Sequence, residues 1–418
     1  MSLEPVVAKV TRHLMPLLLL MYVLAFLDRT NIGFAKDAFE ADTGVGDAAY
    51  AFGASVFFIG YAVLEVPSNL ILHRVGARLW LSRIMVSWGL VSAMTAFVHG
   101  AGGFYAVRTL LGLTEAGFFP GVILYLTYWY PKSARARSIG IFYYGAPLAF
   151  ILGGPLSGQL LDLDGLLGFR GWQLMFLVEG LLASLAGVAI FFLLDDRPEH
   201  ARWLDADEKH ALGKALAADE EQKPDEMRGA GRALRDPRVL FLSLIYVLIQ
   251  MGVYGLSFFL PTQVAKLLGK SVGLEVGLVS AVPWIAALIV VTLVPPHADR
   301  TGTHRGWGAA VLALAALGLA VSALTASPLL AIAALSLAAA GLILAQPMFW
   351  TFPTALLGGA GAAGGIALIN SIGNLGGFLA PNFRAFLEIS FGGQAAGLLG
   401  LAIIVLLGAG LMLAVKRP

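Results

Sequence analysis

Long runs of apolar residues, separated by short polar turns, recur along the whole chain. Each run is about 20 residues long, which is the length that an α-helix needs to cross the hydrocarbon core of a bilayer. Prolines inside several runs do not exclude helices, because neighbouring helices in a membrane can satisfy the freed backbone groups. The pattern predicts twelve transmembrane helices, at residues 14–34, 49–72, 79–98, 103–129, 137–161, 172–194, 238–263, 273–295, 307–326, 328–352, 361–387 and 393–414.

One long polar segment interrupts this pattern near the middle of the chain. It separates six apolar runs from six others, and so predicts an all-α membrane protein with two pseudo-symmetric six-helix bundles. We expect an N-terminal bundle over residues 1–194, a cytoplasmic linker over 195–236 and a C-terminal bundle over 237–418. Within the linker, Asp205 followed by Glu208 is a variant of the capping box and predicts the start of a short amphipathic helix.

The composition agrees with a membrane protein and excludes several kinds of site. Of the 418 residues 58% are hydrophobic and 13% charged, whereas soluble domains are about 25% charged. The chain has no cysteine, which excludes disulfides and thiolate metal sites. It also lacks the spaced motifs of zinc proteases, P-loops and dinucleotide-binding folds. We therefore expect no enzyme activity, cofactor, metal or nucleic-acid partner, and the expected partners are the lipid bilayer and a small molecule.

Most of the 28 lysines and arginines fall in the segments on the side of the N-terminus. By the positive-inside rule these segments face the cytoplasm. We expect both termini to be cytoplasmic, and the protein to be a multi-pass protein of a bacterial inner membrane. Arg29 and Arg108 are exceptions, because neither falls in a loop or at the edge of a predicted helix.

The two halves repeat one short polar turn. The sequence HRVGAR follows the second predicted helix, and DRTGTHR follows the eighth. An offset of 226 residues pairs Arg74 with Arg300 and Gly76 with Gly302. Such repeats are typical of transporters that place their site between two related halves. The turns predict gating or structural roles for Arg74, Gly76, Arg78, Asp299, Arg300 and Gly302.

Four charged residues fall inside the predicted N-terminal helices. Asp28 and Arg29 lie near the end of the first helix, and Arg108 and Glu115 share one face of the fourth because they are seven residues apart. A rise of about 1.5 Å per residue places Asp28, Arg29 and Arg108 at a similar depth, with Glu115 deeper. Charges at such depth usually face a bundle interior or a wet cavity. We expect the four to converge between the bundles; a purely structural ion-pair network that joins the two helices is the alternative.

These four groups suggest a way to couple an anion to a proton. Two arginines balance two carboxylates, so an added organic anion brings a surplus negative charge that protonation of one carboxylate removes. Arginine suits this role because its planar fork can hold a carboxylate bidentately. When the substrate takes the arginine, the acid loses its partner and binds a proton, and the two binding events favour each other. Asp28 and Glu115 are the predicted proton-coupling residues, and Arg29 and Arg108 the predicted anion-binding residues.

The C-terminal half has no acid or base in the middle of its predicted helices. Its helices offer uncharged polar and aromatic side chains instead, namely Gln250, Tyr254, Ser257, Trp350, Asn370 and Asn374. We expect these residues, with Tyr61 of the second helix, to contact the body of the substrate. Hydrogen bonds or packing between helices are the alternative for each, and are favoured for Ser257 and Asn374. Glu65 and Glu179 are interpreted as structural.

The motifs together resemble the major facilitator superfamily, of which two related six-helix halves and paired basic turns are typical. In that superfamily an acid usually precedes the first arginine of the turn after the second helix. His73 stands at this position, whereas the second copy keeps Asp299. In the N-terminal half, the turn therefore lacks the acid to which the gate salt bridge is normally attributed.

Within the superfamily the chain resembles the anion:cation symporters. The motifs are FLDRTNIGFA, EVPSN, RTLLGLTEAGFFPG, YLTYWYP, DRPEHARWLDADEK and INSIGNLGGFLAP. The resemblance implies that Asp28 and Glu115 carry protons and that Arg29 and Arg108 bind or couple the substrate carboxylate. The residues that would line the substrate cavity are Tyr61, Trp350 and Asn370.

The expected function is proton-coupled import of a small organic carboxylate by alternating access of a monomer. A sugar acid, a tartrate-like acid or an aromatic acid would each fit, and the proton is the coupling ion, with no other cofactor. The sequence GGPLSG at 153–158 loosely resembles a motif associated with antiporters, although close helix packing is its simpler explanation. An organic-anion exchanger or exporter of the same fold is therefore the alternative, and a membrane sensor a remote one.

Overall fold

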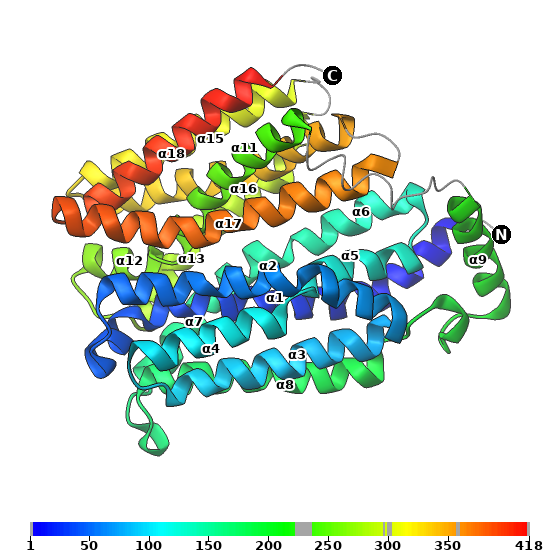
Figure 1. Cartoon of the computed structure of the whole chain (residues 1–418), viewed down its shortest axis with the longest axis horizontal. Helices are drawn as coiled ribbons and strands as arrows, with labels where there is room; N and C mark the ends of the chain where they lie inside the picture. Colours follow the sequence, from blue (N-terminus) through cyan, green and yellow to red (C-terminus); the bar gives the residue numbers. More distant parts are fainter. Residues whose placement is uncertain (1–2, 222–235, 296, 299–302, 357–359, 416–418) are drawn as a thin grey trace.

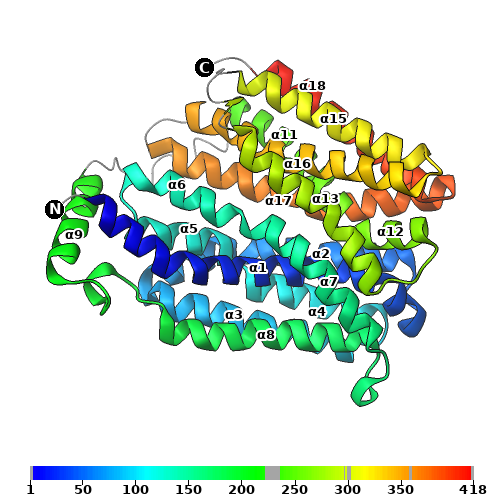
Figure 2. The ribbon, with the colours of Figure 1, turned by 180° about the vertical axis from the view of Figure 1, so that it is seen from behind.

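The computed structural model describes residues 3–221, 236–295, 297–298, 303–356 and 360–415, and every regular element in these ranges is a helix. The N-terminal half contains α1 (Leu3–Thr43), α2 (Asp47–Val75), α3 (Ala77–Met94), α4 (Gly100–Glu115), α5 (Phe118–Trp129), α6 (Lys132–Tyr143), α7 (Gly145–Asp162) and α8 (Gly171–Leu193). The C-terminal half contains α11 (Pro237–Ser257), α12 (Leu260–Leu268), α13 (Leu274–Leu293), α15 (His304–Leu324), α16 (Pro328–Leu356), α17 (Ala360–Phe391) and α18 (Gln394–Ala414). Figures 1 and 2 show the long helices lying side by side along one common axis.

The number of membrane crossings agrees with the hydrophobic pattern. Within the described residues 11 helices, some of them broken, are long and apolar enough to cross a bilayer, and α17, with 32 residues, has the length for a twelfth crossing. Large apolar side chains such as Leu185, Phe192 and Leu329 are exposed on the outside of the bundles, as expected of surface that contacts lipid. The prediction of an all-α membrane protein with twelve crossings is confirmed.

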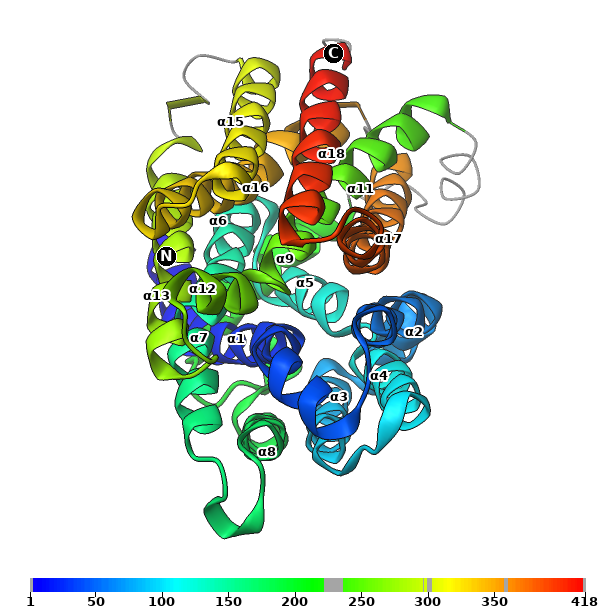
Figure 3. The same ribbon diagram turned by 90° about the vertical axis from the view of Figure 1, so that its left-hand side faces the viewer.

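Each half has its own hydrophobic core. One cluster of buried residues is centred on the N-terminal helices and includes Phe104 and Trp129, and the other is centred on the C-terminal helices and includes Phe349 and Leu401. Figure 3, a view along the helices, shows the two groups and the places where they meet, with α17 beside α2 and α13 beside α7. A site between the halves must therefore be built from these helices and their inner neighbours, α1, α4 and α11.

The fourth predicted helix is broken at the residue that matters most for the site. It forms α4 and α5, which are separated by Ala116 and Gly117. Gly117 has a φ of 86°, a left-handed conformation that glycine adopts without the steric penalty of a side chain. The α4 helix therefore ends at Glu115. The predicted span over 103–129 is confirmed, but the helix is interrupted within it. Apolar periodicity does not report such a local change of backbone direction.

Two other predicted helices are also divided. The run at 238–263 forms α11 and α12, with the break at Phe258 and Phe259. The run at 137–161 forms α6 and α7, with the junction at Tyr144. Apolar residues continue across each junction, so the sequence pattern predicted single helices there.

The linker begins with a segment that packs on the N-terminal half. The predicted capping box is present at the start of α9 (Ala206–Glu221): the Asp205 N–H donates to Glu208 over 2.9 Å, and the Glu208 N–H donates to Asp205 over 2.8 Å. Trp203 stacks on His13 of α1 and on Trp129 of α5, with ring centroids 4.1 and 5.5 Å apart. The described part of the linker is thus attached to one half rather than suspended between two.

The basic turn between α2 and α3 is held by an acid from this same segment. The Arg78 N–H donates to the Asp196 carboxylate over 2.8 Å, and the Arg78 guanidinium lies 4.6 Å from the Phe191 ring. Arg74 is exposed, and Gly76 ends α2. Asp196 therefore places a carboxylate at a turn where His73 replaces the usual acid. The second copy of the turn, with Asp299, Arg300 and Gly302, lies outside the described residues.

Candidate functional site

Arg29 and Glu115 form a buried ion pair between α1 and α4. The Arg29 Nη2 atom lies 2.6 Å from Glu115 Oε1, and Arg29 Nε donates to the same oxygen over 2.8 Å. The two side chains are 9% and 0% exposed, and Glu115 Oε2 has no hydrogen-bond partner. Since removal of one member would leave a buried charge uncompensated, the pair holds the two helices together firmly.

Arg108 is the second buried guanidinium, and it is not neutralised in the same way. Its Nη2 donates to the Ala54 carbonyl of α2 over 3.1 Å, its Nε has no hydrogen-bond partner, and no carboxylate in the described residues lies within ion-pair distance of it. The Phe57 ring lies between the two arginines, 5.4 Å from the Arg29 guanidinium and 5.3 Å from that of Arg108. Cation–π attraction to the ring offsets part of the cost of burial.

Within the described residues Asp28 forms no ion pair with either arginine, although it lies within electrostatic range of Arg108 and Glu115. Its carboxylate accepts hydrogen bonds from Trp88 Nε1 over 2.7 Å, from Ser92 Oγ over 2.8 Å and from Asn31 Nδ2 over 3.3 Å. Trp88 and Ser92 lie one turn apart on α3, so Asp28 joins α1 to α3 while Arg29 joins α1 to α4. Helical periodicity separates adjacent residues by about 100°, which is enough to send the two side chains to different neighbours.

Tyr61 and Tyr254 complete the surroundings of Arg29. The Tyr61 ring lies 5.0 Å from the Arg29 guanidinium, and the Phe26 ring lies 5.2 Å from it. Tyr254 of α11 interacts electrostatically with Arg29, and its ring meets the edge of Phe58 at 4.7 Å. The C-terminal half therefore reaches the ion pair through Tyr254.

A close backbone contact makes this approach possible. A Cβ atom on Gly33 of α1 would lie 2.5 Å from the Phe258 carbonyl oxygen, at the break between α11 and α12. Glycine is thus the residue that lets the broken segment pack directly against α1, about one turn after Arg29.

The remaining C-terminal residues are distributed along the junction rather than gathered at the arginines. Gln250 is buried behind Gly376 of α17, and Trp350 meets the edge of Tyr246 at 4.9 Å. Asn370 lies beside Glu65, and Asn374 is half-buried on the same helix. Ser257 donates to the Val253 carbonyl within its own helix over 2.6 Å.

Three tyrosines at this junction were missed by the sequence analysis. Tyr22 interacts electrostatically with Arg29 and with Tyr143, Tyr246 and Tyr254, so phenol groups from both halves lie within range of the same guanidinium. One signal was available: Tyr246 lies four residues before Gln250 and extends the polar stripe of α11 by one turn. Tyr22 and Tyr143 carry no such signal, because they lie in apolar runs.

Two polar groups outside the arginine cluster also connect helices. Glu65 is 6% exposed and accepts a hydrogen bond from Ser371 of α17 over 3.2 Å, so it joins the two halves. Arg384, also missed, is 0% exposed: its Nε lies 2.6 Å from Glu388 Oε1, and its Nη1 donates to the Gly255 carbonyl over 3.1 Å. Arg384 therefore donates to a backbone carbonyl near the end of α11, next to the break.

The end of the molecule away from the N-terminus is closed by contacts between and within the halves. Gly154 of α7 and Gly277 of α13 touch backbone to backbone, and a Cβ on Gly154 would lie 2.5 Å from the Gly277 carbonyl oxygen. The Phe150 and Trp284 rings stack with centroids 3.9 Å apart. The GGPLSG motif thus serves close helix packing between halves.

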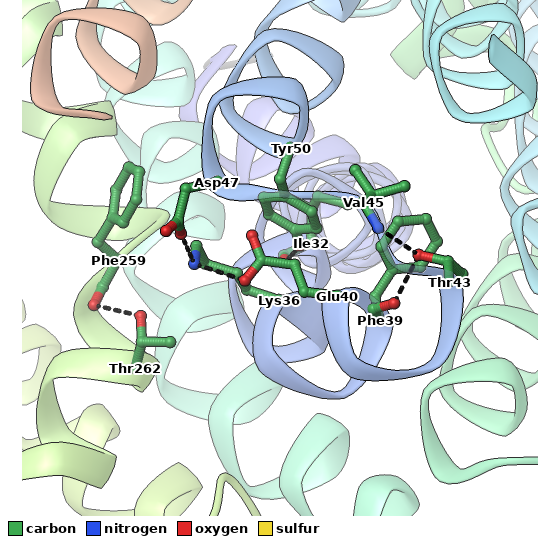
Figure 4. A network of polar contacts seen from close by, with 10 residues as sticks. All are labelled: Ile32, Lys36, Phe39, Glu40, Thr43, Val45, Asp47, Tyr50, Phe259 and Thr262. Carbon is green, nitrogen blue, oxygen red and sulfur yellow. Dashed lines mark hydrogen bonds and ion pairs between the residues drawn. The ribbon is translucent and has the colours of Figure 1, made fainter. Parts of the chain in front are cut away.

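Two further features lie near this closed end. Lys36 near the end of α1 bridges Glu40 and Asp47 over 2.9 and 2.5 Å, which fastens α1 to the start of α2 (Figure 4). A cleft of about 10 Å³, room for a single water, lies between the halves. Its lining includes Thr30, Phe34, Phe150, Ser257 and Ser280.

The described residues contain no cluster of three or more histidine, aspartate or glutamate side chains that could hold a metal ion. What the arrangement can do is bind an anion at a buried, incompletely neutralised arginine and exchange a proton at neighbouring carboxyls. It offers no nucleophile–base pair for a covalent step.

Comparisons with known proteins identify the family to which the chain belongs. The model of the Major Facilitator Superfamily matches residues 18–381. The chain is 48% identical over 406 residues to the inner membrane transport protein RhmT of Escherichia coli (strain K12), covering 97% of this chain and 94% of that protein. It is 43% identical over 412 residues to a putative tartrate transporter of Agrobacterium vitis, covering 99% and 95%. It is 41% identical over 407 residues to a quinolone resistance transporter of Acinetobacter baumannii, covering 97% and 93%.

A solved structure shows the same fold. The crystal structure of a bacterial homologue of the human lysosomal transporter Spinster, in an inward-facing and unoccupied conformation, aligns with a TM-score of 0.77 at 18% identity over 98% of this chain and 97% of that one. The family model and the named relatives confirm the resemblance inferred from the motifs, and also the expectation that the protein is not an enzyme. The chain belongs to the Major Facilitator Superfamily and is a multi-pass membrane transporter of a small molecule.

Proposed function

We propose that the protein is a proton-coupled symporter of a small organic carboxylate, such as a sugar acid, a tartrate-like acid or an aromatic acid. The observation that carries the proposal is the buried Arg108 guanidinium, which has no carboxylate partner among the described residues and lies one ring away from the Arg29–Glu115 pair. A carboxylate that enters this junction would meet Arg108, which is incompletely neutralised, and could share Arg29 with Glu115.

The coupling follows from competition for Arg29. Both polar contacts of the Glu115 carboxylate are made by Arg29 to Oε1, and Oε2 has no hydrogen-bond partner. If a substrate carboxylate takes Arg29, Glu115 is left buried without a cation, and ionisation there becomes costly. Glu115 then takes up a proton, so that anion and proton bind together and leave together.

Tyr61 and Tyr254 would contact the substrate from the two sides of the junction, because both lie against Arg29. Gln250, Trp350, Asn370 and Asn374 would contact larger substrates deeper in the junction. Asp28 would act as a proton carrier that is not itself bound to an arginine. We further propose that the protein works as a monomer in a bacterial inner membrane, with both termini cytoplasmic and with the two halves, 1–194 and 237–418, moving about the linker.

Uptake by purified protein in proteoliposomes tests this proposal. A panel of radiolabelled hydroxy, sugar and aromatic acids, tartrate included, is offered with and without an inward proton gradient. We expect at least one acid to accumulate only with the gradient. Glu115→Gln should lose accumulation but keep exchange of that acid across the membrane. The matched control is Glu275→Gln, an exposed acid paired with Lys270 far from the site. Gradient-independent accumulation in the wild type would refute symport.

Export or exchange of organic anions is the second candidate. One similarity favours it, since a protein 41% identical to this chain is named a quinolone resistance transporter. Counterflow that persists while proton-driven uptake is absent in the wild type would support this candidate over symport.

A further inference from the structure

Glu179 on α8 is a buried acid without a cation. It is 0% exposed, Ser157 Oγ of α7 donates to its Oε1 over 2.7 Å, and its Oε2 has no hydrogen-bond partner. Within the described residues no lysine, arginine or histidine forms an ion pair with Glu179 or with Asp28. An ionised carboxylate in such surroundings is costly unless it is well hydrogen-bonded, and Glu179 accepts only one strong hydrogen bond.

Asn31 connects this acid to Asp28. Its Nδ2 donates to Asp28 Oδ1 over 3.3 Å, its side chain is in contact with Glu179, and its own Oδ1 has no partner. Two oxygens without partners, Glu179 Oε2 and Asn31 Oδ1, therefore belong to side chains that touch. Both are acceptors, so neither can satisfy the other as long as Glu179 is ionised. One hydrogen on Glu179 Oε2 would satisfy both, because the hydroxyl could donate to Asn31 Oδ1.

We propose that Glu179 holds a proton in this conformation and donates a hydrogen bond through it to Asn31 Oδ1, so that Asp28 and Glu179 together carry one proton and one negative charge. Asp28 keeps the charge because three neutral donors, Trp88, Ser92 and Asn31, point at it. Glu179 would be a third proton-carrying acid of the N-terminal half. Its use in transport depends on the proposed proton coupling, whereas its protonation does not.

The groups around Glu179 are uncharged apart from Asp28. The α1 helix contributes Asp28 and Asn31, and α7 contributes Ser157. From α3, Gly89 and Ala93 pack against Gly180, the next residue of α8. No other titratable side chain of the described residues acts on Glu179.

The position of Ser157 suggests what the proton would influence. Ser157 lies between Gly154 and Gly158, the residues through which α7 touches Gly277 and Gly273 of α13. A change of charge on Glu179 would alter its hydrogen bond to the same turn of α7 that closes the two halves. The proposed proton on Glu179 therefore lies next to the contact between α7 and α13, which must open during alternating access.

Infrared spectroscopy of the purified full-length protein at neutral pH tests the proposal without a substrate. We expect a carbonyl band of a protonated carboxyl group that shifts in heavy water, that is lost in Glu179→Gln, and that persists in the matched control Glu388→Gln. If the band is the same in wild type and Glu179→Gln, the proposal is overturned. The result is independent of the transport assay, so carboxylate symport and the protonation of Glu179 can fail separately.

A second variant covers the case in which Glu179→Gln does not fold. Ser157→Ala removes the donor to Oε1, so the carbonyl band should remain but move to higher frequency. An unmoved band would contradict the assignment. Replacement of K⁺ by Na⁺ provides a further check: if Na⁺ raises the melting temperature of the wild type but not of Glu179→Gln, and the band is absent, the oxygens bind a cation and the proposal falls.

Discussion

Each half of the transporter buries an arginine that pairs with a glutamate over 2.6 Å, yet the two pairs differ in what they join. Arg29 and Glu115 come from α1 and α4, 86 residues apart in the chain. Arg384 and Glu388 are one turn apart on α17. A pair between helices can be opened by a small helix movement or by an inserted anion, whereas a pair within one turn moves as a unit.

This difference indicates that the two halves have different roles. The N-terminal half carries the charges that can change partners, and its second arginine, Arg108, has no carboxylate partner in the described residues. In the C-terminal half Arg384 donates hydrogen bonds to Glu388 and to the Gly255 carbonyl, and its guanidinium lies 4.2 Å from the centre of the Phe259 ring. We infer that one arginine set takes part in transport and the other fixes the break between α11 and α12.

The largest effect is expected from removal of the Arg29–Glu115 pair. Arg29→Met or Glu115→Leu alone should abolish accumulation of substrate and destabilise the protein by about 3–5 kcal/mol, because each leaves a buried charge unpaired. The double variant should regain most of that stability, because no uncompensated charge remains, but none of the transport. Thermal unfolding in detergent and uptake in proteoliposomes measure the two effects. Transport by the double variant would show that the pair is only structural.

Arg108→Gln should separate binding from stability. The amide can still donate to the Ala54 carbonyl, so little stability should be lost, but the charge that attracts the anion is gone. Hydrogen bonds to charged groups contribute about 1.5–3 kcal/mol, which corresponds to a fall in affinity of about 10–150-fold. Ligand-induced thermal shifts across a concentration series measure the affinity. Unchanged affinity would remove Arg108 from the site.

Arg384→Met should show the opposite behaviour to Arg108→Gln. The change leaves the Gly255 carbonyl and one oxygen of Glu388 without their donor, at a cost of about 1–3 kcal/mol for each buried group left unsatisfied. Affinity for the substrate and the dependence on the proton gradient should stay near the wild-type values once folded protein is compared. If Arg384→Met loses substrate binding at full folding, the division between the halves is wrong.

The sequence predicted the twelve crossings, and placed three charged residues inside the N-terminal bundle, for clear physical reasons. Lipid requires long apolar helices, so hydrophobic runs report them directly. Charges inside such runs are costly, so Arg29, Arg108 and Glu115 were conspicuous. The direction of Asp28 was not predictable in the same way, because periodicity gives the face of a helix but not the neighbour that the face meets.

The breaks and the buried polar partners could not be found from the pattern. Gly117 lies among many other glycines, and only the backbone shows which of them adopts a left-handed conformation. Arg384 lies near the end of an apolar run, where an arginine would usually reach toward the membrane surface. Its burial depends on the packing of α17 against α11, a contact between distant segments that no local pattern encodes.

Tyr254→Phe should change substrate selectivity through the C-terminal half. The ring and its edge contact with Phe58 remain, but the hydroxyl group near Arg29 is lost. We expect affinity to change by a factor that corresponds to about 0.5–1.5 kcal/mol, more for hydroxylated acids than for simple ones, with proton coupling intact. Competition uptake with a hydroxylated and a deoxygenated acid measures the selectivity. A loss of coupling instead would assign Tyr254 to the charge-handling half of the mechanism.

The smallest effect is expected where the linker contacts the N-terminal half. Lys9 Nζ lies 2.6 Å from Glu208 Oε2, and its hydrogen bond holds the pKa of Glu208 below the ordinary value. A lowered native pKa contributes stability above the ordinary value of about 4.3, and this contribution is lost as the pH falls through the native pKa. The pair is partly exposed to solvent, so Lys9→Ala should flatten this acid dependence only slightly in a melting curve recorded against pH, and leave transport unchanged. A large loss of transport in Lys9→Ala would mean that the linker contact, and not the arginine pair alone, governs movement of the N-terminal half.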